Sequence, residues 1–365
     1  MGPFAGCFGE LPDPRAENAR HDLVEILFIA LAALLCGAEG CADMADFGRA
    51  KEGLLRRVLR LSHGIPSHDT FSRVFRVLDP TAFEAAFRRF MAAFAKAATI
   101  RGVVAVDGKA LRGAFARGQR STPLHLVNVW AAEARLAVAQ RVAPGRNEVA
   151  GALEALELLS LDGCIVTADA LHANRKMAQL ILDRGGAYVL AVKGNQGPLF
   201  ADVQAHIDDF AASTPAEEVL SASHGRCEHR RAVVRRAAAL GRAHDFPGLA
   251  AVARVELQRR VGESDEPPIV RYFLLSKWFA AKRLMAIVRT HWTIENQLHW
   301  VLDVVFDEDR ARNRKDNGPA NLAVLRKLAL NLLRSHPDRA SLRRKVKKAG
   351  WDDTFLISLL ATQMR

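Results

Sequence analysis

The sequence predicts an α/β protein built on a mixed sheet with helices on both faces, and three observations support this class. Three runs rich in valine and other apolar residues follow one another between residues 103 and 142. From residue 147 to residue 210 the pattern alternates between helix and strand, as it does where helices connect parallel strands. A second strand-rich stretch then precedes a long helical pattern. Half of the 365 residues are hydrophobic, which is enough for a substantial core.

Residues 1–20 are rich in glycine, proline and charge, and they are expected to form a flexible arm. Residues 21–100 carry helical periodicity and are predicted to form an N-terminal helical domain that binds DNA. Within it Ser67 is a good N-cap for a helix, and His68 and Arg73 follow it on that helix. Two interpretations stay open, a helix-turn-helix-like DNA reader and a simple packed bundle.

The first part of the α/β core is predicted over residues 101–210. Strands are expected at Val103–Asp107, His125–Ala131, Leu136–Val142, Cys164–Asp169 and Tyr188–Lys193, and helices at Asn147–Leu159, Asn174–Arg184 and Pro198–Phe210. With three antiparallel strands followed by two strands joined through helical crossovers, this is the order of a ribonuclease-H-like mixed sheet.

The remaining chain divides into three predicted segments. Residues 211–279 form a β-strand-rich insertion, because short strand patterns there are separated by loops. Residues 280–335 return to helical periodicity and form the second part of the core. Residues 336–365 form a basic C-terminal tail and helix.

The charge of the chain favours a polyanionic partner. Its 52 Lys and Arg residues outnumber 40 Asp and Glu residues, which gives a net charge of +12 and a pI near 9.9. The segment from Arg310 to Lys348 holds thirteen basic and two acidic residues, and therefore +11 of that charge. Solvated helical faces are the ordinary explanation for single cations in it. As a block, with Arg312 and Arg314 near its start, it predicts a surface that contacts phosphate.

Cysteine spacing and hydropathy point to the cytoplasm and away from the membrane. The five cysteines form neither a CxxC pair nor a disulfide framework, which is typical of a reduced compartment. The most apolar stretch, Leu23–Ala38, is interrupted by Glu25 and is shorter than the roughly 20 residues that a bilayer requires. No basic and apolar signal peptide is recognised at Met1.

Three carboxylates are candidates for one metal site. Asp107 and Asp169 each end a predicted strand, and neighbouring strands of this order would bring them side by side. Glu295 shares a predicted helical face with His291 and Leu298, so it is expected to be buried and to need a partner. Each residue alone is better explained as a turn former, a cap or a surface acid. Together they suit Mg²⁺, for which Mn²⁺ can substitute, because these ions prefer oxygen ligands.

Several polar residues near these acids are candidates for other roles. Lys109, Arg112 and Lys193 could hold a phosphate, although each could also be an ordinary exposed cation. A zinc site at His224, Cys227 and His229 is less favoured than a polar strand edge, because a fourth ligand at suitable spacing is missing. Trp292 and Trp300 could stack on an unpaired base, but core packing is the more frequent role.

Several motifs in this chain, taken together, resemble bacterial insertion-sequence transposases of the ISAs1 family, in the IS4-like DDE group, and the related H-repeat-associated proteins. The likeness is carried by Gly64-Ile65-Pro66-Ser67-His68-Asp69-Thr70-Phe71, Val106-Asp107-Gly108-Lys109-Ala110-Leu111-Arg112-Gly113, Lys193-Gly194-Asn195-Gln196, His224-Gly225-Arg226 and the segment from His291 to Val304. The resemblance implies a DDE triad of Asp107, Asp169 and Glu295 on a ribonuclease-H-like fold. It also implies Mg²⁺-dependent strand cleavage and transfer, and it places Arg226 near DNA.

One signature of the IS4-like group is altered. The pattern Y-x2-R-x3-E-x6-K around the glutamate falls here on Val288, His291, Glu295 and Leu302. Arg289 and His299 are candidate substitutes for its polar members, and both are candidate DNA contacts, as is His291. The expected partners are double-stranded DNA at terminal inverted repeats and at target sites, in a homodimeric complex associated with the bacterial nucleoid. Two alternatives stay open, a decayed or domesticated DNA-binding relative and a stand-alone nuclease.

Overall fold

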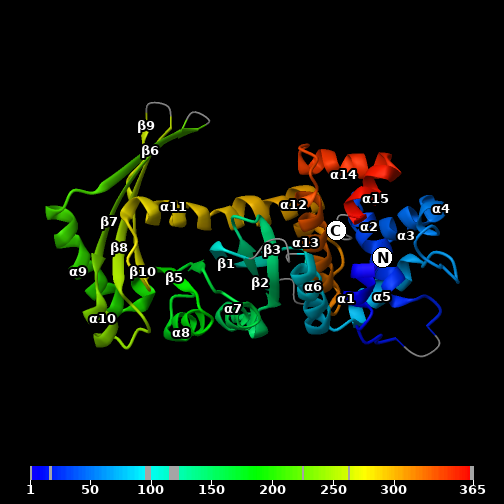
Figure 1. Ribbon diagram of the computed structural model, residues 1–365, viewed down its shortest axis with the longest axis horizontal. Coiled ribbons are helices and arrows are strands. Elements are labelled where there is room, and N and C mark those ends of the chain that lie inside the picture. Colours follow the sequence, from blue (N-terminus) through cyan, green and yellow to red (C-terminus); the bar gives the residue numbers. More distant parts are fainter. Residues whose placement is uncertain are drawn as a thin grey trace.

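The computed structural model describes residues 2–15, 19–94, 100–114, 123–223, 226–261 and 264–361. A helical part that carries both chain ends lies beside a long twisted sheet, and the sheet extends away from it to the strands of the insertion (Figure 1). The chain therefore has the predicted α/β architecture, with the core sheet between the N-terminal helices and the insertion.

In the described part of the chain, six helices precede the sheet. They are α1 (Gly2–Phe8), α2 (Leu23–Leu35), α3 (Cys41–Ala50), α4 (Glu52–Leu55), α5 (His68–Val77) and α6 (Pro80–Phe94). Helix α2 begins where the side chain of Asp22 accepts a hydrogen bond from the backbone N–H of Glu25. Eleven of its thirteen residues are buried, which is the pattern of a helix surrounded by protein.

The prediction that residues 1–20 form a flexible arm is wrong for their first part. Phe4 and Phe8 of α1 are fully buried, and their rings stack with centroids 4.4 Å apart. Both rings also contact Phe90 of α6. Burying two phenylalanines stabilises α1 against the helical domain by several kcal/mol, which outweighs the breaking tendency of the glycines around them.

The core sheet has the ribonuclease-H-like order. Its strands are β1 (Gly102–Leu111), β2 (Leu124–Ala131), β3 (Leu136–Val142), β4 (Cys164–Ala168) and β5 (Ala187–Val192), placed in space as β3-β2-β1-β4-β5. Strands β1, β2 and β3 are antiparallel, whereas β4 and β5 run parallel to β1. Helices α7 (Glu148–Glu157), α8 (Arg175–Asp183) and α9 (Pro198–Ser213) follow β3, β4 and β5. This order confirms the predicted fold.

The insertion extends the same sheet. Its strands are β6 (Glu217–Ser223), β7 (Arg226–Arg236), β8 (Ala251–Val261), β9 (Ser264–Asp265) and β10 (Ile269–Leu275), and the short helix α10 (Ala238–Ala243) lies between β7 and β8. Strand β10 pairs antiparallel with β5, and β8, β7 and β6 continue outward from it. The core and the insertion are therefore joined by backbone hydrogen bonds.

The C-terminal third is helical. It contains α11 (Ala281–His291), a π-helical turn at Ile294–His299, α12 (Trp300–Phe306), α13 (Gly318–Ser335), α14 (Leu342–Trp351) and α15 (Asp353–Ala361). Helix α13 is buried from Gly318 to Leu333 and packs between β3 and the N-terminal helices. Asn321 donates to the carbonyls of Phe75 and Leu78, and Asn331 donates to the carbonyl of Ala137. Helix α13 thus ties the helical domain to the sheet.

The basic C-terminal block is less exposed than expected. Arg326, Lys327 and Lys345 are buried, and Lys348 pairs with Asp338 at 2.5 Å. Arg312 and Arg314 lie on the exposed connection before α13. Part of the positive charge therefore stabilises the fold. Among the described helices, none is long and apolar enough to cross a bilayer.

Candidate active site

Asp107 lies within a strand, and the prediction that it ends one is wrong. Strand β1 continues to Leu111 because its pairing with β2 persists, and Asp107 faces Asn128 in that ladder. On its other side, the ladder between β1 and β4 ends at the pair Val106 and Ala168. Asp107 is therefore the first residue of β1 beyond its parallel neighbour, where the sheet opens.

Asp169 follows the last residue of β4 and so takes the matching position beside Asp107. Its Oδ1 atom accepts a hydrogen bond from the backbone N–H of Leu171 at 3.0 Å, which fixes the turn. Half of its side chain is exposed, at 49%. The prediction that two strands bring these acids together is supported by this register.

Glu295 lies in the π-helical turn between α11 and α12, and it is exposed. The expectation that it is buried on one face with His291 and Leu298 is wrong. The backbone N–H of Trp300 bonds to the carbonyl of Glu295, five residues earlier, so the turn is wider than an α-helical one and changes which residues share a face. Segments of this kind are frequent at functional sites.

The pKa of Asp107 reflects its burial and the negative charges of the other two candidate acids. Burial raises the pKa of Asp107 to about 7, with further contributions from the negative charges of Glu295 and Asp169. The backbone N–H of Gly108, which donates to Asp107 Oδ1 at 2.9 Å, opposes this shift. A carboxyl group beside two others repels them unless a cation compensates the charge.

The donor set suits a hard divalent cation. Over the part of the chain that the structure describes, no three His, Cys, Asp or Glu side chains converge closely enough to hold one ion together. Mg²⁺ sites commonly use only one or two protein carboxylates for each ion, with waters and substrate phosphates as the other ligands. Three acids that include Asp107, with mutual repulsion that a cation relieves, are compatible with this kind of site.

Glu148 is a fourth acid near Asp107 that sequence reasoning missed. It lies in the first turn of α7 and pairs with His125 Nδ1 at 2.7 Å. A Cβ atom at Gly108 would lie 2.3 Å from Glu148 Oε2, so a side chain at this position would collide with the carboxylate. A side chain at position 108 would therefore displace the Glu148 carboxylate from its place beside His125, a relationship that the sequence motif alone does not reveal.

Lys109 does not face solvent, and the prediction that it contacts phosphate is wrong. Its side chain is buried, and its Nζ atom lies 2.5 Å from Asp303 Oδ1 and 3.0 Å from Glu308 Oε2. It also donates to the carbonyl of His299. The alternation of β1 directs Lys109, like Asp107, toward the helix that carries the glutamate, and its charge is used in the interior.

Two histidines expected to contact DNA are also internal. His299 is only 8% exposed, with Nε2 at 3.1 Å from Asn128 Nδ2 and Nδ1 at 3.7 Å from Asp107 Oδ2. Burial lowers the pKa of His299 to about 3. His291 Nδ1 lies 3.0 Å from Thr167 Oγ1, and burial lowers its pKa to about 4. Both rings are therefore neutral near pH 7. They pack the segment from α11 to α12, which carries Glu295, onto the sheet.

Other candidates lie on the surface around the acids. Arg112 is exposed at the end of β1, Arg289 is exposed on α11, and Lys193 is exposed after β5, where it lines a small pocket with Asp169. Arg226 opens β7, but its side chain and the residues His224 and Gly225 lie outside the described part of the chain. These positions leave Arg112, Lys193 and Arg289 as candidate phosphate contacts.

A basic cavity of about 700 Å³ lies beside Glu295, between α11 and strands β7, β8 and β10. The arginines that line it are Arg230, Arg259, Arg271 and Arg289. The guanidinium of Arg271 lies 4.6 Å from the ring centre of Trp292, which also lines the cavity. Arginine and an aromatic ring beside a candidate catalytic acid are suited to a phosphate-containing chain.

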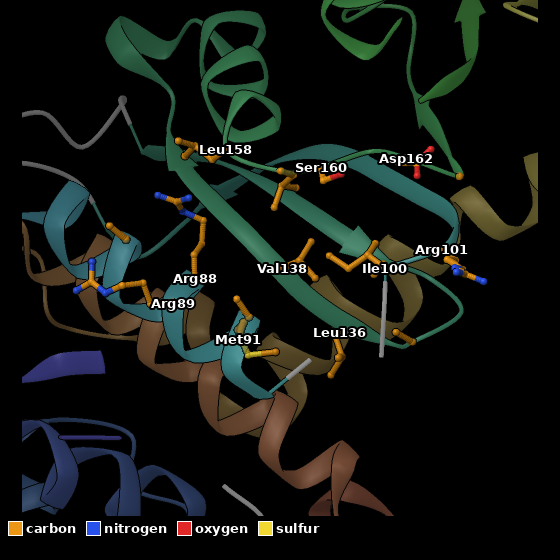
Figure 2. Close-up of a pocket in the computed structure, with 16 residues that line it drawn as sticks. Arg88, Arg89, Met91, Ile100, Arg101, Leu136, Val138, Leu158, Ser160 and Asp162 are labelled. Carbon is orange, nitrogen blue, oxygen red and sulfur yellow. The ribbon is translucent and has the colours of Figure 1, made fainter. Parts of the chain in front are cut away.

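A second cavity, of about 710 Å³, contains none of the candidate site residues. Figure 2 shows Arg88 and Met91 on α6 facing Leu136 and Val138 on β3, with Leu158 at the far end. Its lining is mainly apolar and lacks a group of carboxylates. The two cavities have nearly the same volume, so cavity volume alone does not identify the candidate site.

The N-terminal candidates are not brought to the triad. Ser67 caps α5 by accepting from the backbone N–H of Thr70, and His68 and Arg73 are exposed along the same helix. Helix α5 contacts α13, which separates it from the sheet (Figure 1). Any contact of these residues with DNA would belong to a surface distinct from the active site.

Comparison with known proteins identifies the family of this chain. A family model described as a transposase DDE domain matches residues 98–332, and one described as DDE_Tnp_1-associated matches residues 5–91. "Putative transposase YncI" of Escherichia coli O157:H7 is 33% identical, over 96% of this chain and 93% of its own. "H repeat-associated putative transposase YhhI" of Escherichia coli (strain K12) is 31% identical, over 96% of each chain.

Among solved structures, a piggyBac transposase synaptic complex with hairpin DNA covers all of this chain and 77% of its own, with 12% identity and a TM-score of 0.47. The identification rests on the sequence matches, which span most of the chain. The chain belongs to the DDE transposase family.

Proposed function

We propose that the protein is an ISAs1-type insertion-sequence transposase that binds terminal inverted repeats and catalyses Mg²⁺-dependent cleavage and transfer of DNA strands. The observation that carries the proposal is the position of Asp107 at the opening of the sheet, where burial, with smaller contributions from Glu295 and Asp169, raises its pKa. Family membership supports the reaction class, and the basic cavity beside Glu295 supports a polyanionic substrate.

In this proposal Asp107, Asp169 and Glu295 hold the divalent cations. The cations, when bound, supply activation of the attacking oxygen and stabilisation of the leaving oxygen. The protein orients the DNA, with Lys193, Arg112 and Arg289 as candidate contacts to the phosphates around the acids. Positive charge on so many exposed side chains predicts binding that weakens steeply with salt.

The other parts of the chain have proposed roles in DNA binding and assembly. The helical domain at residues 21–100 would contact DNA through the exposed face of α5, which carries Ser67, His68 and Arg73. Arg312 and Arg314 would contact DNA from the connection before α13, and Arg226 from the start of β7. The active complex is proposed to be a homodimer on DNA in the bacterial cytoplasm, associated with the nucleoid.

The test is an end-cleavage assay on a plasmid that carries the inverted repeats flanking the coding region. The wild type, incubated with Mg²⁺, is expected to cut at the repeat ends and to join them to target DNA. The Glu295→Gln variant, which keeps the side-chain shape, is expected to bind the ends without cutting them. Glu157→Gln, an exposed acid on α7, is the matched control and is expected to act as the wild type does.

Two outcomes would favour the alternatives. Wild-type binding without cleavage would contradict a transposase and indicate a decayed DNA-binding relative. The altered signature gives this alternative its basis, because Leu302 is buried where the IS4-like group has lysine. Cleavage without joining to target DNA would instead indicate a stand-alone nuclease.

A further inference from the structure

The imidazole ring of His299 lies between Asn128 and Asp107, with one ring nitrogen near each of them. It belongs to the π-helical turn that carries Glu295, and its ring reaches down to the sheet. Its Nε2 atom lies 3.1 Å from Asn128 Nδ2, and its Nδ1 atom lies 3.7 Å from Asp107 Oδ2. Asn128 and Asp107 are directly opposite in the ladder of β1 and β2. The ring therefore connects Asp107 with its partner across the strands.

The chemistry of these contacts favours one tautomer of His299. The amide nitrogen of Asn128 can only donate, so Nε2 of the imidazole must accept and carries no proton. The proton of the neutral ring is then on Nδ1, which faces Asp107. A carboxylate accepts hydrogen bonds and does not donate them, so an Nδ1–H in this position attracts Asp107 Oδ2, whereas an Nδ1 lone pair would repel it.

The surroundings hold the ring in this position. Asn128 is fully buried and His299 nearly so, so neither exchanges its partner for bulk water. The backbone carbonyl of His299 accepts from Lys109 Nζ, which is held in turn by Asp303 and Glu308. The backbone of His299 is therefore anchored to β1, and the hydrogen bond to Asn128, whose Oδ1 atom has no partner among the described residues, orients the ring.

We propose that His299, held by Asn128 as the Nδ1–H tautomer, is a positioning residue that directs the Asp107 carboxylate toward a divalent cation. In this proposal the ring acts through Asp107 and contacts neither the DNA nor the cation. The inference rests on the metal-dependent function proposed above. Groups that orient a metal ligand in this way usually contribute about 10- to 100-fold to metal affinity.

The first experiment reads the tautomer and requires no metal. The full-length protein is labelled with ¹⁵N-histidine, and the His299 resonances are identified by their loss in His299→Gln. At a pH above about 7, where Asp107 is ionised, the expected spectrum shows a protonated Nδ1 and an unprotonated Nε2. Asn128→Asp places an acceptor beside Nε2, so it is expected to move the proton to that nitrogen. A wild-type His299 with its proton on Nε2 would overturn the proposal.

The second experiment measures the affinity for Mn²⁺ by titrating the full-length protein in a calorimeter. His299→Gln keeps an amide near Asn128 but removes the donor that faces Asp107, and it is expected to weaken binding by about tenfold or more. His299→Asn places an amide nitrogen near the position of Nδ1, so it is expected to stay within about threefold of the wild type. Melting temperatures confirm that both variants fold.

Controls separate this inference from the proposed function. Asp107→Asn is expected to remove most of the binding, which identifies the signal as that of the carboxylate site. Equal Mn²⁺ affinity in the wild type, His299→Gln and Asn128→Asp, with loss in Asp107→Asn, would overturn the role of His299 and leave the proposed function intact. A wild type that binds no Mn²⁺ would contradict the proposed metal site, and the positioning role with it.

Discussion

The Nζ atom of Lys109 lies 3.0 Å from Oε2 of Glu308, inside the protein and two residues along β1 from the candidate ligand Asp107. Glu308 is buried with Lys327 and Arg326 also near it, and together with Lys109 they hold its pKa at about 2. Asp303 contributes a second acid to Lys109. This buried cluster joins β1 to α12 and the turn after it. It therefore fixes Asp107, on β1, relative to Glu295, which lies just before α12.

The Glu308→Gln variant should lose much of the stability of the protein. Without the negative charge, Lys109 and Lys327 remain buried beside each other with less compensation, and breaking a buried pair in this way typically costs about 3–5 kcal/mol. Urea unfolding followed by circular dichroism measures the loss. Glu157→Gln, an exposed acid, should change stability by less than about 0.5 kcal/mol. A loss of that small size for Glu308→Gln would contradict the structural role of the cluster.

Stability should fall in mild acid because His291 is buried in its neutral form. The pKa of His291 is about 4 in the folded protein and 6.5 in its ordinary state, so the unfolded chain binds more protons between these values. Stability is therefore expected to decrease as pH falls from 6.5 toward 4, with a slope of up to about 1.4 kcal/mol per pH unit from this group.

The check is denaturant unfolding at several pH values in that window, on the wild type and on His291→Gln. Because glutamine does not titrate, the variant should have a shallower dependence than the wild type. His299, with a pKa of about 3, has the same sign and accounts for part of the slope that remains. Identical slopes for the two proteins would show that His291 titrates normally in the folded state.

Removal of the Asp107 charge should stabilise the metal-free protein while it removes activity. This carboxylate is buried beside Asp169 and Glu295, so Asp107→Asn relieves both desolvation and repulsion. We expect a gain of about 1–2 kcal/mol in the presence of a chelator, the trade-off known for functional sites. Calorimetric melting with and without Mg²⁺ measures it. Mg²⁺ should raise the melting temperature of the wild type only, and a lower stability of the variant would argue against repulsion at the site.

Arg312 should contribute to DNA affinity without sequence preference. It is exposed on the connection before α13, in the most basic part of the chain. If it contacts a phosphate, Arg312→Ala should weaken binding to all duplexes and reduce the salt slope by about 1. Fluorescence anisotropy over a salt series measures both quantities. Arg184→Ala, an exposed cation after α8, is the control, and equal effects of the two variants would indicate only a loss of overall charge.

The sequence predicted the core well because strand and helix periodicities reflect local burial. The order of β1 to β5 and the position of Asp169 after β4 followed directly from these patterns. Pairing with β2 keeps Asp107 inside β1, and this depends on a neighbour that periodicity does not describe. Periodicity does not predict the burial of Phe4 and Phe8 either, because their contacts with Phe90 form only when distant helices pack together.

The positions of charged side chains, inside the protein or at its surface, were the hardest to predict. From the sequence, Lys109 is expected to be an exposed cation, because its partners, Asp303 and Glu308, follow almost two hundred residues later. α-helical spacing predicts a buried Glu295, but the π-helical turn changes which residues share a face, and no local signal in the sequence marks that turn. Both errors arise where tertiary contacts decide which side of an element faces the protein.

The most direct test of the account is the rate of Mg²⁺-dependent cleavage at the element's ends by four proteins: the wild type, Asp169→Asn, Glu295→Gln and the variant that lacks all three acids. If Asp107, Asp169 and Glu295 act as one centre, each single substitution should lower the rate about as far as the triple substitution does, because groups that act as a unit are not additive. Single variants that cut within about tenfold of the wild-type rate would contradict a three-carboxylate active site.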